Sequence, residues 1–558
     1  RRPLFAAMMF ASVAGISYQL VLMRLFAVES SSSFGYMFIS IAMLAVGMSG
    51  TVLALFRDWA VRHLDGLLAF TSLVATILLV VATFGTHCVP FVPFKILEDP
   101  HQLLYLGSYY VLYFLPMFAG TSFIALMLTA FPTSVNRLYF FDLLGAALGG
   151  LATVLGMFAL SPEHLPTIPI VMFGVAHVCS LIGTRRGWQW ACVSVPMMVA
   201  CVMAILLFAT REVSEFKGIS YSLATTEVSG ARVVEERNGP LGLMQVVDSS
   251  VERSAPGLSS NTPEDRVPPV EFGLYCDGSR LGPLSRDPGS AQSLYMDYMV
   301  TAAPYIASPP RSVAVLGVGG GFAVREALHH QASRVVAVEL NPVILDLLGN
   351  TFADYTGHLL DRPEVGTVLA DGRAWAETTK ERFDLVLLNI FDVSGLSYSW
   401  SAGSSEDFLH TVEAFHTFLS ILEPGGMVAI PVRLNDPPRA DLKALATAIK
   451  VLQDVTIHPE DSIIMVRETF FGIILVKPDA FMPGEVQAVR QFCEDKGFDL
   501  SWAPGLTAEE TNRFTELPEE TYFKLAVAAF SSEGGLDRFV DDYPFDVRPT
   551  YDDRPYFS

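Results

Sequence analysis

Residues 312–328 read SVAVLGVGGGFAVREAL, and they decide the fold of the second half of this chain. An apolar run, Ser312–Val318, leads into Gly319-Gly320-Gly321, and a helix-forming segment follows. A buried strand that enters a helix through a glycine turn is typical of parallel α/β sheets. Strand-like and helix-like runs continue to alternate, with further strands expected at 334–340, 366–370, 383–388, 427–432, 463–466 and 470–476. This alternation predicts a Rossmann-like domain over residues 311–480.

Glycines and acids stand at the ends of the first three of these strands. They are Gly317, Gly319, Gly320 and Gly321 after the first strand, Glu339 at the end of the second, and Asp371-Gly372 after the third. Glycines let a ligand approach the backbone, and a carboxylate after the second strand can accept hydrogen bonds from both hydroxyls of a ribose. Asp371 is placed to accept one from an adenine amino group. Phe322 stands where a dinucleotide fingerprint has its third glycine, which disfavours NAD and FAD. The pattern predicts a nucleoside pocket.

The first 210 residues have a different composition. Of the 558 residues, 51% are apolar and 17% are charged, against about 25% charged in typical soluble domains. Residues 1–210 hold 9 Lys and Arg against 7 Asp and Glu, a net charge of +2, so the remainder carries −23 and the whole chain −21. Seven apolar runs are long enough to cross a bilayer, at about 4–26, 35–56, 66–86, 103–130, 139–160, 166–183 and 189–209. We therefore predict a multi-pass α-helical membrane domain over 1–210, in contact with the lipid bilayer, joined to an acidic soluble half.

Basic residues occur on alternate connections between these runs, which places the N-terminus in the cytosol. Seven crossings would then put the acidic half on the far side, where a nucleotide cofactor is not normally available. We expect a multi-pass protein of the inner (cytoplasmic) membrane with a cytosolic soluble domain, and its sidedness stays open. Gly145-x-x-x-Gly149 predicts close packing of two helices. Arg24 and Asp142 either form a polar path or ion pair within the membrane, or reach its interfaces.

The remaining segments are less regular. Residues 211–310 are expected to form a small β-rich subdomain with a mobile Ser/Pro-rich loop at 249–270, and residues 481–558 a C-terminal helical extension with an acidic tail. None of the six cysteines forms a C-x-x-C pair, and His329-His330 are neighbours on a predicted helix, where adjacent side chains face different directions. We expect no metal site. The acidic half lacks the basic surface that nucleic-acid binding needs.

Several motifs now combine into a family resemblance. They are Tyr275-Cys276-Asp277-Gly278, Tyr295-Met296-Asp297, the glycine loop with Arg325-Glu326, Val338-Glu339-Leu340-Asn341 and the run Phe383–Leu388. Over about 241–480 the chain resembles the spermidine synthase (polyamine aminopropyltransferase) family. It is most similar to members fused to a multi-helix region, which share a helix like Leu138–Gly150 and a tail like Asp552-Asp553-Arg554-Pro555. The resemblance implies an S-adenosylmethionine-methyltransferase-type fold, S-adenosylmethionine or its decarboxylated form as cofactor, and a polyamine or other small amine as substrate, with Asp277 and Tyr295 at the substrate site.

The sequence departs from this family at two positions of the expected site. The family's catalytic Asp-Ser-Ser-Asp loop is Asn389-Ile390-Phe391-Asp392 here, so the expected base is Asn389, whose amide cannot take a proton at neutral pH. Asp392 is what remains of the catalytic pair. Phe322 replaces the Asp expected to bind the cofactor's ammonium. The Ser/Gly-rich loop that follows carries Tyr398 and Trp400, and is either a lid over an apolar ligand or an ordinary surface loop.

Three functions remain open at this point. The first is a membrane-anchored aminopropyltransferase that uses an amine acceptor. The second is a methyltransferase of the same fold that acts on a lipid or another apolar acceptor. The third is a catalytically degenerate subunit that serves as a binding or scaffold module in a membrane complex, with other membrane subunits or a second copy of the chain as partners.

Overall fold

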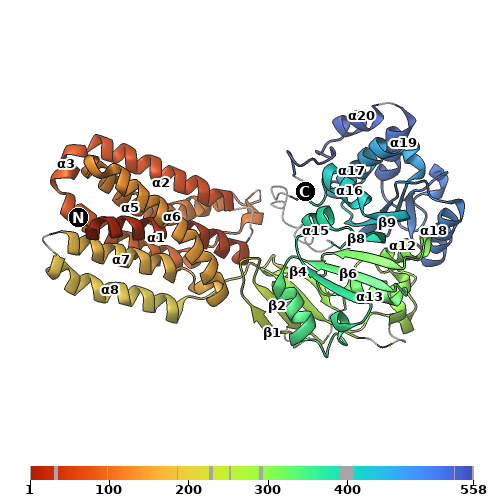
Figure 1. Ribbon diagram of the computed structural model, residues 1–558, viewed down its shortest axis with the longest axis horizontal. Helices are drawn as coiled ribbons and strands as arrows, with labels where there is room; N and C mark the ends of the chain where they lie inside the picture. The colour runs from red at the N-terminus through yellow and green to blue at the C-terminus, as the bar shows by residue number, and fades with distance from the viewer. Residues whose placement is uncertain are drawn as a thin grey trace. The chain divides into compact units, whose positions relative to one another are not determined.

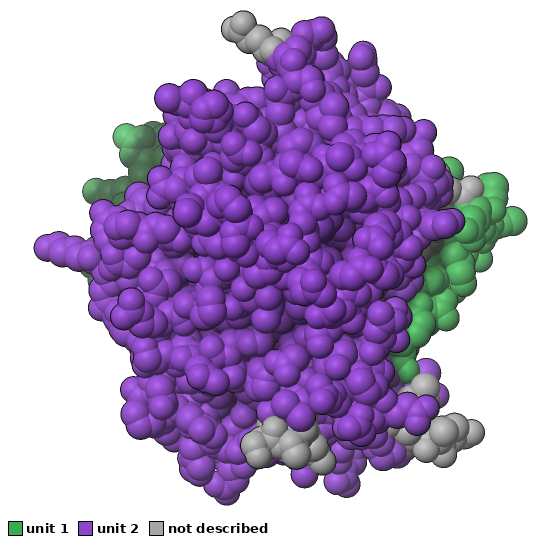
Figure 2. Space-filling view, turned by 90° about the vertical axis from the view of Figure 1, so that its right-hand side faces the viewer, with its two compact units in different colours: residues 1–221, 237–243 green, residues 222–236, 244–558 purple. Residues whose placement is uncertain are grey.

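The computed structural model describes residues 2–555, except for 31–34, 97, 185–186, 225–229, 251–252, 288, 290–292, 390–406 and 533. The chain divides into two compact units, which Figure 2 colours separately. The first consists of Arg1–Tyr221 with Arg237–Leu243, and the second of Ser222–Glu236 with Met244–Ser558. Each unit is considered on its own below.

The first unit is helical. Seven helices in the described part of the chain are long and apolar enough to cross a membrane, and their number and positions agree with the seven predicted runs. They are α1 (Arg2–Glu29), α2 (Gly35–Leu55), α4 (Leu64–Gly85), α5 (His101–Ala130), α6 (Val135–Ala159), α7 (Thr167–Gly183) and α8 (Gly187–Phe208). Figure 1 shows them running roughly alongside one another. Many of their large apolar side chains face outwards, including Met43, Val193 and Phe208.

Glycines on α6 allow it to lie directly on α1. A Cβ atom on Gly145 would come within 2.3 Å of the Met9 carbonyl oxygen, and one on Gly149 within 2.6 Å of the Val13 carbonyl oxygen. The predicted close packing at these glycines is therefore confirmed. One turn before Gly145, Asp142 accepts a hydrogen bond from the Ser12 hydroxyl, and both line a cavity of about 410 Å³ within this unit. Arg24 is buried in α1.

The second unit is built on an eight-stranded sheet of order β12-β10-β11-β9-β8-β5-β6-β7. Five neighbouring strands are parallel: β5 (Ser312–Leu316), β6 (Arg334–Glu339), β7 (Val365–Leu369), β8 (Phe383–Leu388) and β9 (Leu422–Arg433). The chain runs outwards from β5 to β7 and then returns to the other side of β5 with β8. This reversal beside β5 is the switch point of a doubly wound sheet, so the Rossmann-like prediction is confirmed.

The other strands of this sheet are antiparallel. β11 (Phe471–Val476) pairs with β9, and β10 (Ile463–Arg467) pairs with both β11 and β12 (Asp499–Trp502). β12 lies beyond residue 480, where the sequence placed the end of this domain, and it forms an edge of the same sheet. The C-terminal segment therefore extends the sheet as well as adding helices.

Both faces of the sheet are covered, which explains why its strands are continuous apolar runs. Along β5, Ala314 and Leu316 belong to one hydrophobic core, whereas Val313 and Val315 belong to the other. Helices α16 (Val412–Ser420), α17 (Ala440–Val455) and α19 (Thr521–Ser531) contribute to the first core. Helices α13 (Phe322–His329) and α18 (Pro483–Lys496) contribute to the second.

A smaller sheet of order β1-β2-β3-β4 precedes the large one in sequence, as expected for residues 211–310. Its strands are β1 (Arg232–Arg237), β2 (Met244–Asp248), β3 (Phe272–Cys276) and β4 (Ser279–Leu284). Within 249–270, the Val300 amide donates to the Gly257 carbonyl oxygen (2.8 Å) and Leu258 forms a β-bridge with Met299. The mobility of this loop stays a prediction.

Candidate functional site

Strand register brings the predicted site residues together. Leu316 of β5 pairs with Val338 of β6 and with Leu388 of β8. The residues that follow, Gly317, Glu339 and Asn389, therefore stand side by side at the carboxyl edge of the sheet. Ligands of doubly wound folds bind at this edge, beside the switch point.

The loop after β5 has a backbone that requires glycine. Gly317, Gly319 and Gly321 have φ values of 89°, 51° and 89°, in the left-handed region that side chains disfavour. Gly320 is constrained by space instead, because a Cβ atom there would lie 1.7 Å from the Pro283 carbonyl oxygen of β4. The loop ends at Gly321, which caps the N-terminus of α13.

Glu339 holds this loop in place. Its Oε2 accepts hydrogen bonds from the amides of Val318 (3.0 Å) and Gly319 (3.2 Å), and its Oε1 accepts one from the Asn341 amide (2.9 Å). A carboxylate offers about four acceptor positions, and the backbone takes three of them. One position is left for a ligand hydroxyl, rather than the two expected for a ribose. Only 7% of Glu339 is exposed. A ligand can therefore reach this carboxylate only from the solvent side of the glycine loop.

Asp371 and Gly372 lie one strand further along the same edge. The Glu339 carbonyl oxygen accepts a hydrogen bond from the Ala370 amide (3.0 Å), which fixes the two strand ends as neighbours. Asp371 caps helix α15 (Gly372–Thr378): its Oδ1 accepts from the Ala374 amide at 2.9 Å. The side chain is exposed. The helix cap uses Oδ1 of Asp371. The other carboxylate oxygen, Oδ2, can accept the predicted hydrogen bond from an adenine amino group.

The C-terminal tail docks beside Asp371. Two guanidinium nitrogens of Arg373 donate to the two carboxylate oxygens of Asp552, each at 2.6 Å. The Thr411 hydroxyl also donates to Asp552 (2.8 Å), and the Asp407 amide donates to the Pro555 carbonyl oxygen (2.7 Å). The sequence contains the tail motif but does not reveal this partner, because Arg373 and Asp552 are far apart in the chain.

Asn389 closes the other side of the loop. Its Nδ2 donates to the Gly317 carbonyl oxygen at 2.8 Å, and its backbone amide donates to the Leu316 carbonyl oxygen at 2.9 Å. The side chain thus acts as a donor towards the loop. The residues expected to complete this region, Asp392, Tyr398 and Trp400, lie outside the described residues.

Asp277 and Gly278 form the turn between β3 and β4. Cys276 pairs with Ser279 across a two-residue loop, and both turn residues have positive φ, 51° and 73°. Asp-Gly is the preferred pair for this type I′ hairpin turn. The turn alone accounts for the motif, and a substrate role for Asp277 stays a prediction.

Tyr295 packs against Phe322, the first residue of α13. Their ring centroids lie 6.4 Å apart, and Met296 and Met299 complete an apolar cluster with them. Tyr295 is buried, and burial together with the charges of Glu271 and Glu326 raises the pKa of its hydroxyl. This part of the site is therefore apolar.

Two buried acids lie near this cluster. Burial raises the pKa of Glu326 to about 8, and its Oε1 accepts from the Thr301 hydroxyl at 2.6 Å. Burial raises the pKa of Glu271 to about 7, and the Arg286 amide donates to its Oε1 at 2.8 Å. Among the described residues, the Oε2 atom of each acid has no hydrogen-bond partner. Glu271 was missed by sequence reasoning, although an acid beside the apolar run Phe272–Tyr275 is a signal for it.

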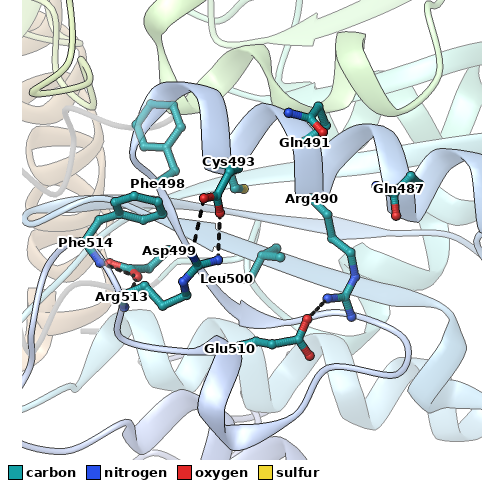
Figure 3. Close-up of a pocket in the computed structure, with 11 residues that line it drawn as sticks. Gln487, Arg490, Gln491, Cys493, Phe498, Asp499, Leu500, Glu510, Arg513 and Phe514 are labelled. Atoms are coloured by element: carbon teal, nitrogen blue, oxygen red, sulfur yellow. Dashed lines mark hydrogen bonds and ion pairs between the residues drawn. The ribbon is translucent and has the colours of Figure 1, made fainter.

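A separate hollow of about 310 Å³ lies between α18 and β12, at the opposite end of the sheet from β7. Figure 3 shows Arg490 pointing to Glu510. Arg513 pairs with Glu494 at 2.7 Å, and its amide donates to Asp499. These pairs neutralise both arginines within the hollow, and it lies apart from the residues predicted to be functional.

Fold and site together define a Rossmann-like domain with a glycine loop and acids at neighbouring strand ends. Residues 293–458 match the family "Spermine/spermidine synthase domain". The chain is 28% identical to polyamine aminopropyltransferase 2 of Pseudomonas aeruginosa over 142 residues, 25% of this chain and 39% of that protein. It is 31% identical to a polyamine aminopropyltransferase of Mycobacterium tuberculosis over 165 residues, 28% of each chain. The predicted family resemblance is thus confirmed: this segment is a spermidine synthase-like domain.

These relatives are matched over only part of their length, less than half in each case. Among solved structures, a spermidine synthase from Thermotoga maritima aligns with a TM-score of 0.32 and 13% identity, covering 56% of this chain and 88% of that one.

Proposed function

We propose that this protein is a membrane-anchored, spermidine synthase-like protein that binds S-adenosylmethionine or its decarboxylated form and transfers an aminopropyl group to an amine. One observation carries the proposal: the glycine loop, Glu339 and Asp371 occupy neighbouring strand ends within a segment that matches the spermine/spermidine synthase domain. Positively charged small amines suit a chain whose second unit carries an excess of acids.

The residues present fit the nucleoside part of such a cofactor. Glu339 keeps one acceptor position for a ribose hydroxyl. Asp371 has one for an adenine amino group on one side of Glu339, and the glycine loop lies on the other side. Bound there, the decarboxylated cofactor would supply an aminopropyl carbon activated by a sulfonium. Phe322 and Tyr295 would contribute an apolar wall on one side of the site.

The acceptor amine must lose a proton during transfer, and Asn389 cannot accept it. Asp392 is then the residue assigned to this step. It stands three residues after Asn389 in the segment where the family has its second catalytic acid.

Membrane anchoring is supported by the surface of the helical unit. Met43, Val193 and Phe208 are among many large apolar side chains exposed on its helices, 72% exposed in the case of Met43. Soluble proteins rarely expose apolar surface on this scale. We propose the cytoplasmic membrane as the location of this protein. Seven crossings from a cytosolic N-terminus would place the second unit on the far side, so a cytosolic position of that unit requires the opposite orientation of the helices.

The hydrogen bond from Asn389 to Gly317 favours a second candidate function. A side chain committed as a donor to the loop serves its structure, which suits a catalytically degenerate subunit that keeps the fold as a binding or scaffold module. Such a subunit would act within a membrane complex, or as a homodimer.

Calorimetric titration of the full-length, detergent-solubilised protein with S-adenosylmethionine and with its decarboxylated form separates these functions. The enzyme requires tighter binding of the decarboxylated form and an aminopropylated product from putrescine or another diamine, detected by mass spectrometry. Preference for the parent cofactor would overturn aminopropyl transfer in favour of methyl transfer. Binding of neither by a folded protein would support the scaffold function. Glu339→Gln should weaken any binding observed, and Glu364→Gln, an exposed acid just before β7, is the matched control.

A further inference from the structure

Three side chains with metal-binding atoms converge at the C-terminal end of α13. Asp297 belongs to the short helix η7 (Ser293–Tyr298), His329 is the last residue of α13, and His330 follows it. One ligand atom from each residue lies within 4.8 Å of the other two. The Nε2 atom of His329 and the Oδ1 atom of Asp297 are 2.8 Å apart.

This arrangement differs from the sequence argument that adjacent histidines on a helix face different directions. The helix ends between them: His330 has φ −82° and ψ 18°, outside helical geometry. The two rings are steeply inclined, at 78°, but their centroids are only 5.0 Å apart. Both imidazoles therefore lie beside one carboxylate, although they are neighbours in the chain.

The ring of His330 is stacked against another ring, and one of its nitrogens is unsatisfied among the described residues. Its ring stacks on Tyr305, with centroids 4.6 Å apart and planes at 15°. Its Nε2 is buried and, within the described part of the chain, has no hydrogen-bond partner. Buried polar atoms are almost always satisfied by protein, water or an ion, so this nitrogen is a second indication that a ligand belongs here.

We propose that Asp297, His329 and His330 bind a divalent transition-metal ion, with Zn²⁺ as the preferred ion. Imidazole nitrogen and carboxylate oxygen are ordinary Zn²⁺ ligands, at about 2.0–2.2 Å from the metal. Tetrahedral coordination at that distance separates ligand atoms by roughly 3.3 Å. His329 Nε2 and Asp297 Oδ1 are 2.8 Å apart and the three atoms lie within 4.8 Å of one another, so metal binding requires shifts of up to about 1.5 Å. The hydrogen atom between His329 and Asp297 must move out of that contact when the metal enters. Three protein ligands leave a fourth position for water.

The ion would connect two elements of the candidate functional site. η7 carries Tyr295, and α13 begins at the glycine loop with Phe322. A metal joining Asp297 to His329 and His330 would tie η7 to the C-terminal end of α13, opposite the end that begins at the glycine loop. Lys496 should weaken metal binding, because its positive charge already interacts with Asp297 and would repel a cation there. The proposal is independent of aminopropyl transfer, since it concerns binding alone.

The test uses full-length protein that has been stripped with EDTA and dialysed, then titrated with Co²⁺ as a spectroscopic probe. We expect one Co²⁺ per chain, visible absorption of a tetrahedral or five-coordinate site with nitrogen ligands, and displacement by Zn²⁺. His329→Ala and Asp297→Asn should each weaken binding at least tenfold. His329 is the primary variant because its side chain is 15% exposed and contacts Asp297 directly. Lys496→Gln should tighten binding.

The matched control is the exposed group His458, Glu460 and Asp461, whose ligand atoms also lie within 4.8 Å of one another. His458→Ala should leave the stoichiometry and affinity unchanged. The proposal is overturned if the stripped, folded protein binds no Co²⁺. It is equally overturned if binding survives in both His329→Ala and Asp297→Asn, or if it is lost in His458→Ala instead. Circular dichroism of each variant shows that the fold is retained.

Discussion

Replacing Glu339 by Gln should destabilise the soluble unit strongly, although it changes only one atom of the side chain. The carboxylate accepts hydrogen bonds from three backbone amides, two at Oε2 and one at Oε1. A glutamine can offer its carbonyl oxygen to one side only. In the better orientation, the glutamine carbonyl oxygen still accepts hydrogen bonds from the Val318 and Gly319 amides. Its NH₂ group then faces the Asn341 amide, which loses its acceptor.

The cost follows from these contacts. A buried amide without a partner costs about 1–3 kcal/mol, and each remaining bond loses about 1 kcal/mol when its acceptor is no longer charged. The sum, about 3–5 kcal/mol, is a large part of the stability of an ordinary domain, about 5–15 kcal/mol. The measurement is a urea titration of the full-length protein in detergent, in which brief proteolysis reports unfolding of the soluble unit.

Glu364→Gln is the control, because this exposed acid precedes β7 without taking part in the loop. It should change the free energy of unfolding by less than about 0.5 kcal/mol. If Glu339→Gln costs no more than this control, the three amides do not depend on the carboxylate. Glu339 would then not be the residue that holds the glycine loop.

Three further predictions follow, two measured by the same urea titration and one by hydrogen exchange. Gly320→Ala should lower the free energy of unfolding by about 3 kcal/mol or more, because its Cβ would lie 1.7 Å from the Pro283 carbonyl oxygen. Gly484→Ala is the control and should leave this free energy nearly unchanged, because the space around Gly484 is open. Between pH 7 and 8 stability should fall by up to roughly 1.4 kcal/mol per pH unit, because folded Glu326 keeps its proton up to about pH 8 while the unfolded chain releases it near 4.5. Glu326→Gln should flatten this slope, and an unchanged slope would contradict the assignment. Asp552→Asn should increase the rate of hydrogen exchange of residues 546–555 several-fold, because it breaks the bidentate pair with Arg373. Asp553→Asn, at an exposed neighbouring residue, is the control. If exchange is equally fast in both variants, the pair with Arg373 does not hold the tail.

Much of the fold could be predicted from sequence because it depends on local pattern. The strand at Phe383–Leu388 has the bounds expected of it, and Arg334–Glu339 ends one residue early. Glu339 and Asn389 each follow an apolar run at the point where a parallel strand ends, so sequence order was enough to place them at one edge of the sheet. The seven long helices follow from the length of their apolar runs in the same way.

What could not be predicted depends on contacts between distant segments. No local pattern relates Arg373 to Asp552, 179 residues later, or assigns β12 to the main sheet. The same is true of His329, the last residue of α13, and Asp297, which lies 32 residues earlier in the chain. Glu339 illustrates a different limit: its position was evident, but the number of its acceptor positions already taken by the backbone was not.

The position of Asn389 bears on how the domain could work. Its Nδ2 lies 2.8 Å from the Gly317 carbonyl oxygen, which needs a donor. An ionised aspartate in the same rotamer would place two oxygens against each other, so an acid here would have to turn away from the loop. Asn therefore fits a loop that is held from both sides, by Glu339 through its amides and by Asn389 through a carbonyl. A base for amine chemistry would need to come from another residue, and Asp392 is the remaining acid of the motif. The same substitution that weakens the case for general-base catalysis at residue 389 thus strengthens the case for a preformed ligand site.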